Sequence, residues 1–291
     1  MRALGTDVSI EGRGAKDVAA EIARLEAVLT RFRPSPLTVL NEAGRLADPP
    51  VELVEALGWA LEVAVATDGL VTPLVGPLLA WHGYARSWPD VEAPCTGLPP
   101  SIASAEEVDV RAELVDLPPG ATLDLGGTAK SWIVERASER FRGPFVIDAG
   151  GDVWLDRSEP SEIEVDPVAG GAPWHLRLPP GRWGVATSSV LGRAWPGAHH
   201  LVDPRTRRPA AGRWVQATVV ARSLRLAEVA TKLVLLGGPL DDRVFAAAWA
   251  STADGRVFAH TPGGWIHEPT TAAPHVDDGA TSPHAPGAAA A

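Results

Sequence analysis

Residues 123–132 read LDLGGTAKSW, which places a carboxylate, two adjacent glycines and a lysine between an apolar run and a predicted helix. Two interpretations compete. In one, Gly126 and Gly127 only form a tight turn into the helix. In the other, they let backbone N–H groups approach an anion, and the positive N-terminus of the helix binds a phosphate. Lys130 favours the second interpretation, because a cation in the first turn opposes the helix dipole and indicates a nearby anion. The spacing matches neither a Walker motif nor GxGxxG, so both interpretations stay open.

The composition limits the classes of partner. The 291 residues are 45% hydrophobic, enough for one large domain or two ordinary ones. Lys and Arg number 26 against 36 Asp and Glu, and this net charge of −10 argues against binding nucleic acid or an anionic membrane. The single cysteine, Cys95, excludes a disulfide framework. Because no long apolar window and no leader pattern are found, we expect no membrane insertion and a cytoplasmic protein.

Helices and strands mix along the chain without a regular βαβ rhythm. Apolar spacing predicts helices over 16–32, 51–69, 129–141 and 226–236. Strands are predicted over 4–10, 108–115, 144–155, 214–221 and 256–260, the last strand. This mixture predicts an α+β fold with a largely antiparallel sheet core and packed helices. We expect one domain over 1–267 and a disordered tail over 268–291, which is rich in Pro, Ala, Thr and Gly.

Three further segments carry candidate chemistry. DAGGDV (148–153) has a second glycine pair between carboxylates, which indicates either a β-bulge or a second wall of one ligand pocket. HHLVDPRT (199–206) combines histidines with a predicted Asx turn. On the last predicted helix, Glu228 and Lys232 are four residues apart, with Thr231 on the same face. They form either an ordinary helical ion pair or, in apolar surroundings, part of a site.

Taken in order, the segments of this chain resemble those of the ApbE family, the FAD:protein FMN transferases, over about residues 3–260. The matching segments are LGTDVSI (4–10), SPLTVLN (35–41), GLVTPLVGPLLAWHGY (69–84), LDLGGTAKSW (123–132), DAGGDV (148–153), VATSS (185–189), HHLVDPRTRRP (199–209) and AEVATKLVLLGG (227–238).

The resemblance implies an ApbE-like, T-fold-like flavin transferase fold and a definite reaction. FMN from FAD would be attached to a threonine of a target protein, with Mg²⁺ required and AMP released. The FAD contacts of the family fall on Leu4, Phe32, Leu70, Val71, Thr72, Asp124, Lys130 and Leu201. Its metal ligands fall on the Gly127 carbonyl, Glu228 and Thr231. The catalytic candidates are Glu228, His200 and Lys130, and the general base is Glu228, Asp203 or His200.

The chain departs from the family pattern on the last predicted helix. The family has Asp where this chain has Glu228, and Thr where it has Lys232. An ammonium repels Mg²⁺, which raises the hypothesis that Lys232 replaces part of the metal site. Two alternatives to FMN transfer therefore stay open: an FAD-binding protein that has lost transfer activity, and an FAD pyrophosphatase that gives FMN and AMP.

Overall fold

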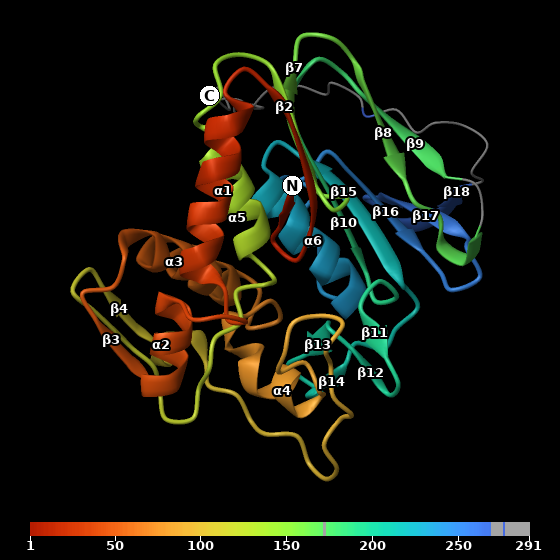
Figure 1. The fold of residues 1–291 in the computed structure, drawn as a ribbon. Helices are drawn as coiled ribbons and strands as arrows, with labels where there is room; N and C mark the ends of the chain where they lie inside the picture. The colour runs from red at the N-terminus through yellow and green to blue at the C-terminus, as the bar shows by residue number, and fades with distance from the viewer. Residues whose placement is uncertain (171–172, 269–275, 277–291) are drawn as a thin grey trace, which may run out of the picture.

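The computed structural model describes residues 1–170, 173–268 and 276, and its centre is a nine-stranded sheet (Figure 1). All of the strand pairs in this sheet are antiparallel. In spatial order the strands are β1 (Arg2–Ala3), β2 (Thr6–Gly12), β6 (Phe145–Ala149), β7 (Val153–Arg157), β10 (Gly181–Ser189), β15 (Gln216–Ala221), β16 (Ala247–Ser251), β17 (Val257–Thr261) and β18 (Gly264–Glu268). The predicted α+β fold with a largely antiparallel sheet is confirmed.

Successive residues of the strands face two separate cores, because side chains alternate across a pleated sheet. Trp154 and Val219 point into the larger core, where the helices lie, and their neighbours Leu155 and Val220 point into the second core. The helices on the first face are α1 (Ala15–Leu29), α5 (Ala129–Ser138) and α6 (Leu224–Leu236) (Figure 1). The opposite face is covered by the hairpin of β8 (Ser161–Val165) and β9 (Trp174–Leu178).

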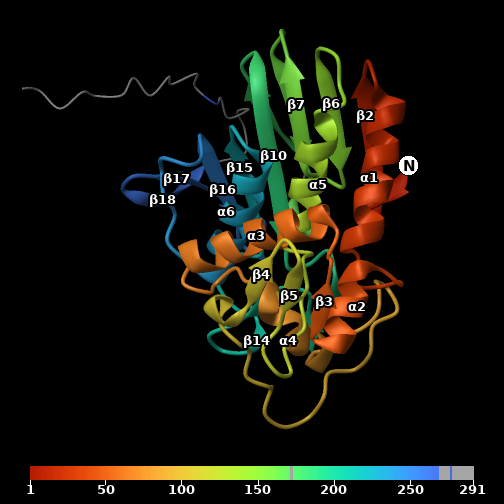
Figure 2. The same cartoon turned by 90° about the vertical axis from the view of Figure 1, so that its left-hand side faces the viewer.

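The remaining elements form a lower region beneath the long strands (Figure 2). Its small three-stranded sheet has the order β3-β5-β4. The elements are α2 (Pro36–Ala43), β3 (Arg45–Ala47), α3 (Val51–Ala66), α4 (Gly76–Trp81), β4 (Asp109–Arg111), β5 (Leu114–Asp116), β11 (Ala194–Trp195), β12 (Ala198–His199), β13 (Val202–Asp203) and β14 (Arg208–Pro209). Three 3₁₀ turns, η1 (Pro73–Val75), η2 (Ala105–Glu107) and η3 (Val168–Gly170), complete the structure.

The DAGGDV segment forms the turn of a hairpin between β6 and β7 and is not a bulge. Gly150 and Gly151 have positive φ values of 68° and 87°, as the two central residues of a type I′ turn require. The N–H of Ala149 donates to the carbonyl of Asp152 at 2.9 Å and closes the turn. A Cβ on Gly150 would lie 2.1 Å from Oγ1 of Thr6, so this glycine also permits close approach of β2.

Several predicted boundaries shift. The strand predicted over 4–10 begins only at Thr6, because Leu4 and Gly5, whose φ values are 56° and 70°, form the turn before it. The helix predicted over 16–32 ends at Leu29, and β18 follows the strand that we expected to be the last. The tail predicted over 268–291 lies outside the described residues except for Glu268 and Val276. None of the helices among the described residues is long and apolar enough to cross a bilayer.

Candidate functional site

The LDLGGTAKSW stretch is an extended segment that turns sharply into α5. Leu123 and Leu125 are buried in the larger core. The side chain of Asn41 fixes the segment, since its Nδ2 donates to the Leu123 carbonyl at 2.9 Å and its Oδ1 accepts from the Leu123 N–H at 2.7 Å. Oδ1 of Asp124 accepts from the N–H of Gly126 at 2.8 Å, an Asx turn that begins the loop. The stretch is therefore a tight turn, and its chemistry depends on the side chains that face it.

Lys130 joins this loop to the second glycine turn. Its Nζ lies 2.6 Å from Oδ2 of Asp152 and 3.5 Å from the carbonyl of Ala149. Asp152 is 2% exposed, and its Oδ1 accepts from the N–H of Thr187 at 3.0 Å. Burial alone would lower the pKa of Lys130, but Asp152 and Glu228 raise it above its ordinary value, so the ammonium stays charged. The anion indicated by the position of Lys130 thus includes the protein's own Asp152.

Asp124 has a partner that sequence reasoning missed. Its Oδ2 accepts a hydrogen bond from Nε of Arg31, and both side chains are largely buried. Arg31 also donates to the Tyr84 carbonyl at 2.8 Å, and its guanidinium lies 4.2 Å from the centre of the Phe32 ring. Arg31 is 93 residues from Asp124, so no spacing in the sequence indicates the pair.

On α6, the polar face predicted from the sequence is buried and fully hydrogen-bonded. Oε2 of Glu228 accepts from Oγ of Ser131 at 2.5 Å, and Oε1 lies 3.2 Å from Nζ of Lys232. Thr231 donates through Oγ1 to the carbonyl of Glu228 at 2.8 Å and lies 2.7 Å from Oγ of Ser188. Glu228 is 2% exposed, so this is not a solvated helical ion pair.

His200 contacts Arg193, a second residue that sequence reasoning missed. Nδ1 of His200 lies 3.4 Å from the Arg193 carbonyl, which can only accept, so Nδ1 carries the proton. Burial, followed by the charges of Arg193 and Lys232, lowers the pKa of His200 to about 4. The guanidinium of Arg193 donates to the hydroxyl of Tyr84 and to the Gly5 carbonyl, both at 3.3 Å. The imidazole is therefore neutral at pH 7, with Nε2 as an acceptor.

Three of the predicted FAD contacts form an apolar surface close to α6. Leu70 and Val71, each 6% exposed, pack with Val229, and Leu201 packs against this cluster. Oγ1 of Thr72 accepts from the N–H of Leu74 at 3.3 Å.

The two remaining predicted FAD contacts lie beside the missed arginines. Leu4 precedes Gly5, whose carbonyl accepts from Arg193. Phe32 is 41% exposed, and its ring centre is 5.6 Å from that of Tyr84. These positions agree with a flavin or adenine ring lying against exposed apolar side chains, although the contacts themselves stay predictions.

Asp203 forms a separate ion pair with Arg205. Both of its carboxylate oxygens accept from Arg205, at 3.0 and 2.9 Å. Burial would raise the pKa of Asp203, but the hydrogen bonds from Arg205 hold it below the ordinary value. Both oxygens of Asp203 are thus engaged by Arg205, as both oxygens of Glu228 are engaged by Ser131 and Lys232. Of the three predicted bases, His200 keeps a ring nitrogen, Nε2, as an acceptor.

The residues expected to bind Mg²⁺ do not fit a resident divalent ion. Both oxygens of Glu228 and the hydroxyl of Thr231 already have partners. A Cβ built on Gly127 would lie 3.5 Å from Cε of Lys232, so the lysine lies between this loop and α6. Mg²⁺ prefers several oxygen ligands, and an ammonium among them would repel it. In the described part of the chain, no group of three or more His, Cys, Asp or Glu could hold a metal ion.

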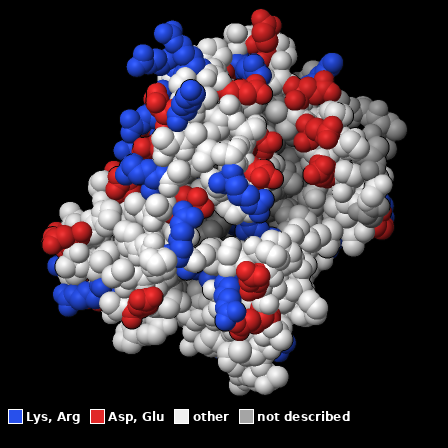
Figure 3. Space-filling view, viewed as in Figure 1, with Lys and Arg blue, Asp and Glu red and all other residues white. Residues whose placement is uncertain are grey.

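Four cations converge on this region of an acidic chain. Arg31 pairs with Asp124 and Lys130 with Asp152, whereas Arg193 and Lys232 both lower the pKa of His200. Figure 3 shows Lys and Arg side chains gathered around a hollow near the middle of this face. Such a concentration of positive charge favours a small anionic ligand.

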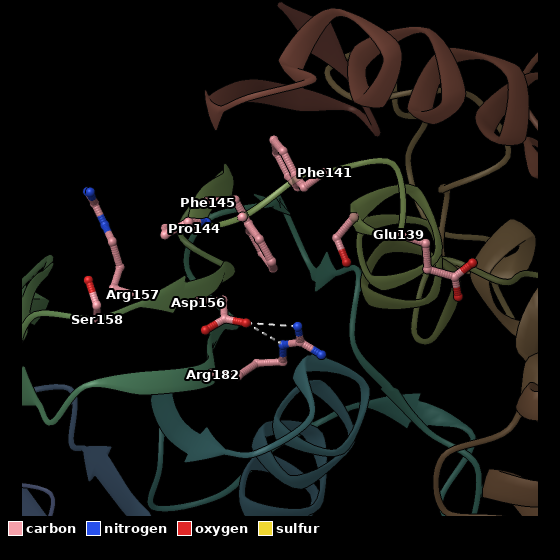
Figure 4. A pocket seen from close by; sticks show the side chains of 10 residues that line it. Glu139, Phe141, Pro144, Phe145, Asp156, Arg157, Ser158 and Arg182 are labelled. Atoms are coloured by element: carbon pink, nitrogen blue, oxygen red, sulfur yellow. Dashed lines mark hydrogen bonds and ion pairs between the residues drawn. The ribbon is translucent and has the colours of Figure 1, made fainter.

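A second hollow lies at the far end of α5 and shares no residue with the predicted site. It has a volume of about 440 Å³, and Asp156 and Arg182 pair across its wall at 2.8 Å (Figure 4). The stacked rings of Phe141 and Phe145 lie nearby, with centres 4.6 Å apart. Because the charges that line it are paired, we assign no ligand to it.

Comparison with solved structures defines the class of fold. The ApbE protein of Thermotoga maritima has a TM-score of 0.74 and 22% identity, covering 88% of this chain and 94% of that chain. The flavin transferase ApbE from Vibrio cholerae has a TM-score of 0.67 and 20% identity, covering 93% and 96%. The fold is therefore that of the flavin transferase structures.

The sequence comparisons show the family. The FAD:protein FMN transferase of Rhodobacter capsulatus is 27% identical over 293 aligned positions, which cover 88% of this chain. They cover 55% of that protein, so the chain spans about half the length of this curated relative. The sequence profile of the ApbE family matches residues 4–252. The chain belongs to the ApbE family.

Proposed function

We propose that the protein transfers FMN from FAD to a threonine of a target protein and releases AMP. The single observation that carries the proposal is the positive charge beside the glycine turn before α5, in a chain whose net charge is −10. Lys130 follows that turn and pairs with Asp152, Lys232 lies close to Gly127, and Arg193 acts on the pKa of Lys130. A diphosphate ester such as FAD needs this charge neutralisation, because phosphoryl transfer depends mainly on positioning and electrostatics. Membership of the ApbE family and the name of the Rhodobacter capsulatus relative support flavin as the group transferred.

The reaction balances without a further reagent. The threonine Oγ forms a bond to the phosphorus on the flavin side of the diphosphate. The bond from that phosphorus to the bridging oxygen breaks, and AMP takes the electron pair. We assign the hydroxyl proton to Nε2 of His200, which is an acceptor because Nδ1 donates to Arg193. Lys130 would balance the charge on the leaving phosphate.

The test measures AMP and covalent flavin separately. The protein is incubated with FAD and a candidate acceptor protein, with Mg²⁺ or with EDTA. AMP is quantified by chromatography, and flavin fluorescence is read on a denaturing gel. We expect AMP and a fluorescent acceptor band in equal amounts, and neither with an acceptor whose threonine is replaced by alanine. AMP release that is independent of acceptor would instead show an FAD pyrophosphatase.

A binding protein without transfer activity is the second candidate. The buried pairing of Lys232 with Glu228 favours it, because the residues expected to hold Mg²⁺ are engaged with each other. Stoichiometric FAD with no AMP in any arm of the assay would support this candidate and contradict the transferase.

A further inference from the structure

Lys232 places an ammonium group on the part of α6 that faces the LDLGGTAKSW loop. Nζ of Lys232 lies 3.2 Å from Oε1 of Glu228 and 3.3 Å from the Glu228 carbonyl. Its side chain is 13% exposed, against 3% for that of Glu228. Cε lies close to Gly127 on the opposite wall. The ammonium therefore contacts Glu228, and its carbon chain lies close to Gly127, so Lys232 meets two of the three residues that the family resemblance implies as metal ligands.

The hydrogen bonds around Lys232 show a site organised for one positive charge. Glu228 uses one oxygen for Lys232 and the other for Ser131. Oγ of Ser131 is also 3.3 Å from the carbonyl of Thr128, and Ser131 is completely buried. A buried charge pair is costly to break, since either partner left alone stays unpaired in a region of low polarity. A divalent ion could reach Glu228 only by displacing the ammonium or Ser131.

We infer that the ammonium of Lys232 is the resident cation of this site, and that the protein binds the diphosphate of its ligand without a divalent metal. The inference rests on the proposed function only in taking a diphosphate ester as the ligand. The negative ester oxygens would be neutralised by Lys232, Lys130 and Arg193, which reach the site from α6, α5 and the segment after β10. The contacts with Glu228 hold the ammonium of Lys232 in place, whereas Mg²⁺ would have to be recruited from solution.

Metal binding is tested directly, without any assay of transfer. Mn²⁺, which replaces Mg²⁺ and is visible by electron paramagnetic resonance, is titrated into the protein with and without ADP. We expect the wild-type protein to bind no Mn²⁺ beyond that held by ADP alone. The Lys232→Thr variant, which removes the ammonium and supplies a hydroxyl, is expected to bind about one Mn²⁺ per chain, and Glu228→Gln in the same variant to abolish it. Wild-type protein that binds one Mn²⁺ through Glu228 would overturn the inference.

The affinity for FAD with and without Mg²⁺ gives a second, independent test of the inference. The dissociation constant for FAD is measured by flavin fluorescence in EDTA and in Mg²⁺. We expect the wild-type values to agree within about twofold, and Lys232→Thr to bind at least tenfold more weakly in EDTA and to recover in Mg²⁺. The matched control is Lys16→Thr, an exposed lysine on α1. Wild-type protein that binds FAD only with Mg²⁺ would overturn the inference even where the variants do not fold. Failure to bind FAD in either buffer would instead overturn the proposed function.

Discussion

At the scale of single residues, the pairing of Lys130 with Asp152 serves both stability and charge. We expect Lys130→Met to weaken FAD binding at least tenfold, since a charge-assisted hydrogen bond is worth about 1.5–3 kcal/mol. We also expect about 3 kcal/mol of lost unfolding free energy, because Asp152 is 2% exposed and would be left without its cation. Isothermal titration and urea unfolding measure the two effects.

A second substitution separates the two roles of Lys130. The double variant Lys130→Met/Asp152→Asn removes the stranded carboxylate, so it should regain stability while FAD binding stays weak. Lys16→Met, on the exposed face of α1, should change neither quantity. If the double variant binds FAD as the wild-type protein does, Lys130 only neutralises Asp152.

The buried imidazole of His200 makes stability depend on pH. Its pKa is lowered from 6.5 to about 4 in the folded protein, so the unfolded chain binds the extra proton first as pH falls. The stabilisation is therefore complete above pH 6.5 and is lost progressively between about pH 6.5 and pH 4. The loss amounts to about 3 kcal/mol. We expect urea unfolding of His200→Gln to lack this contribution, and parallel pH profiles for variant and wild type would contradict the assignment.

At the scale of elements, the β6–β7 turn offers two neighbouring glycines with different constraints. Gly150→Ala should cost about 3 kcal/mol or more, because the new Cβ would lie 2.1 Å from Oγ1 of Thr6 in addition to the strain of a positive φ. Gly151→Ala has the strain alone, with nothing within 4 Å, and should cost about 1 kcal/mol. Urea unfolding compares the two variants, and equal costs would show that the approach of β2 does not constrain this turn.

The elements also show which parts of the structure the sequence could predict. The helices at 129–138 and 224–236 and the glycine turn before α5 were predictable, because period and turn chemistry are local properties. The hairpin turn at Gly150 and Gly151 was not, since that glycine pair was expected to form a bulge or a pocket wall. The β8–β9 hairpin was missed although its apolar residues alternate, as in WHLRL (174–178). Arg31 and Arg193 could not be predicted, because their contacts with Asp124 and Gly5 join distant segments. Site chemistry was therefore predictable where one segment supplied it, and not where two segments meet.

At the scale of the whole molecule, the candidate site draws on segments from both ends of the chain, from Arg31 to Lys232. FAD should therefore stabilise the folded protein as one unit. At 100 times its dissociation constant it would contribute about 2.7 kcal/mol. This corresponds to a rise of roughly 5–10 °C in the midpoint of thermal unfolding. Circular dichroism should show one transition that shifts with FAD in the wild-type protein. In Lys130→Met the shift should be at most about half as large, because tenfold weaker binding leaves about 1.4 kcal/mol at the same FAD concentration. Two separate transitions, only one of which shifts, would contradict a single unit.

The place of β2 in the large sheet has a consequence for synthesis on the ribosome. Val8 pairs with Ala149, so β2 is made long before its partner strand. At about 5–20 residues per second, the intervening chain takes roughly 7–28 s to emerge. During that interval one edge of the nascent β1–β2 hairpin lacks its neighbour. Asp7 and Glu11 place negative charges along the unpaired β2. Nascent chains on neighbouring ribosomes carry the same charges, and their repulsion opposes pairing between two copies of β2.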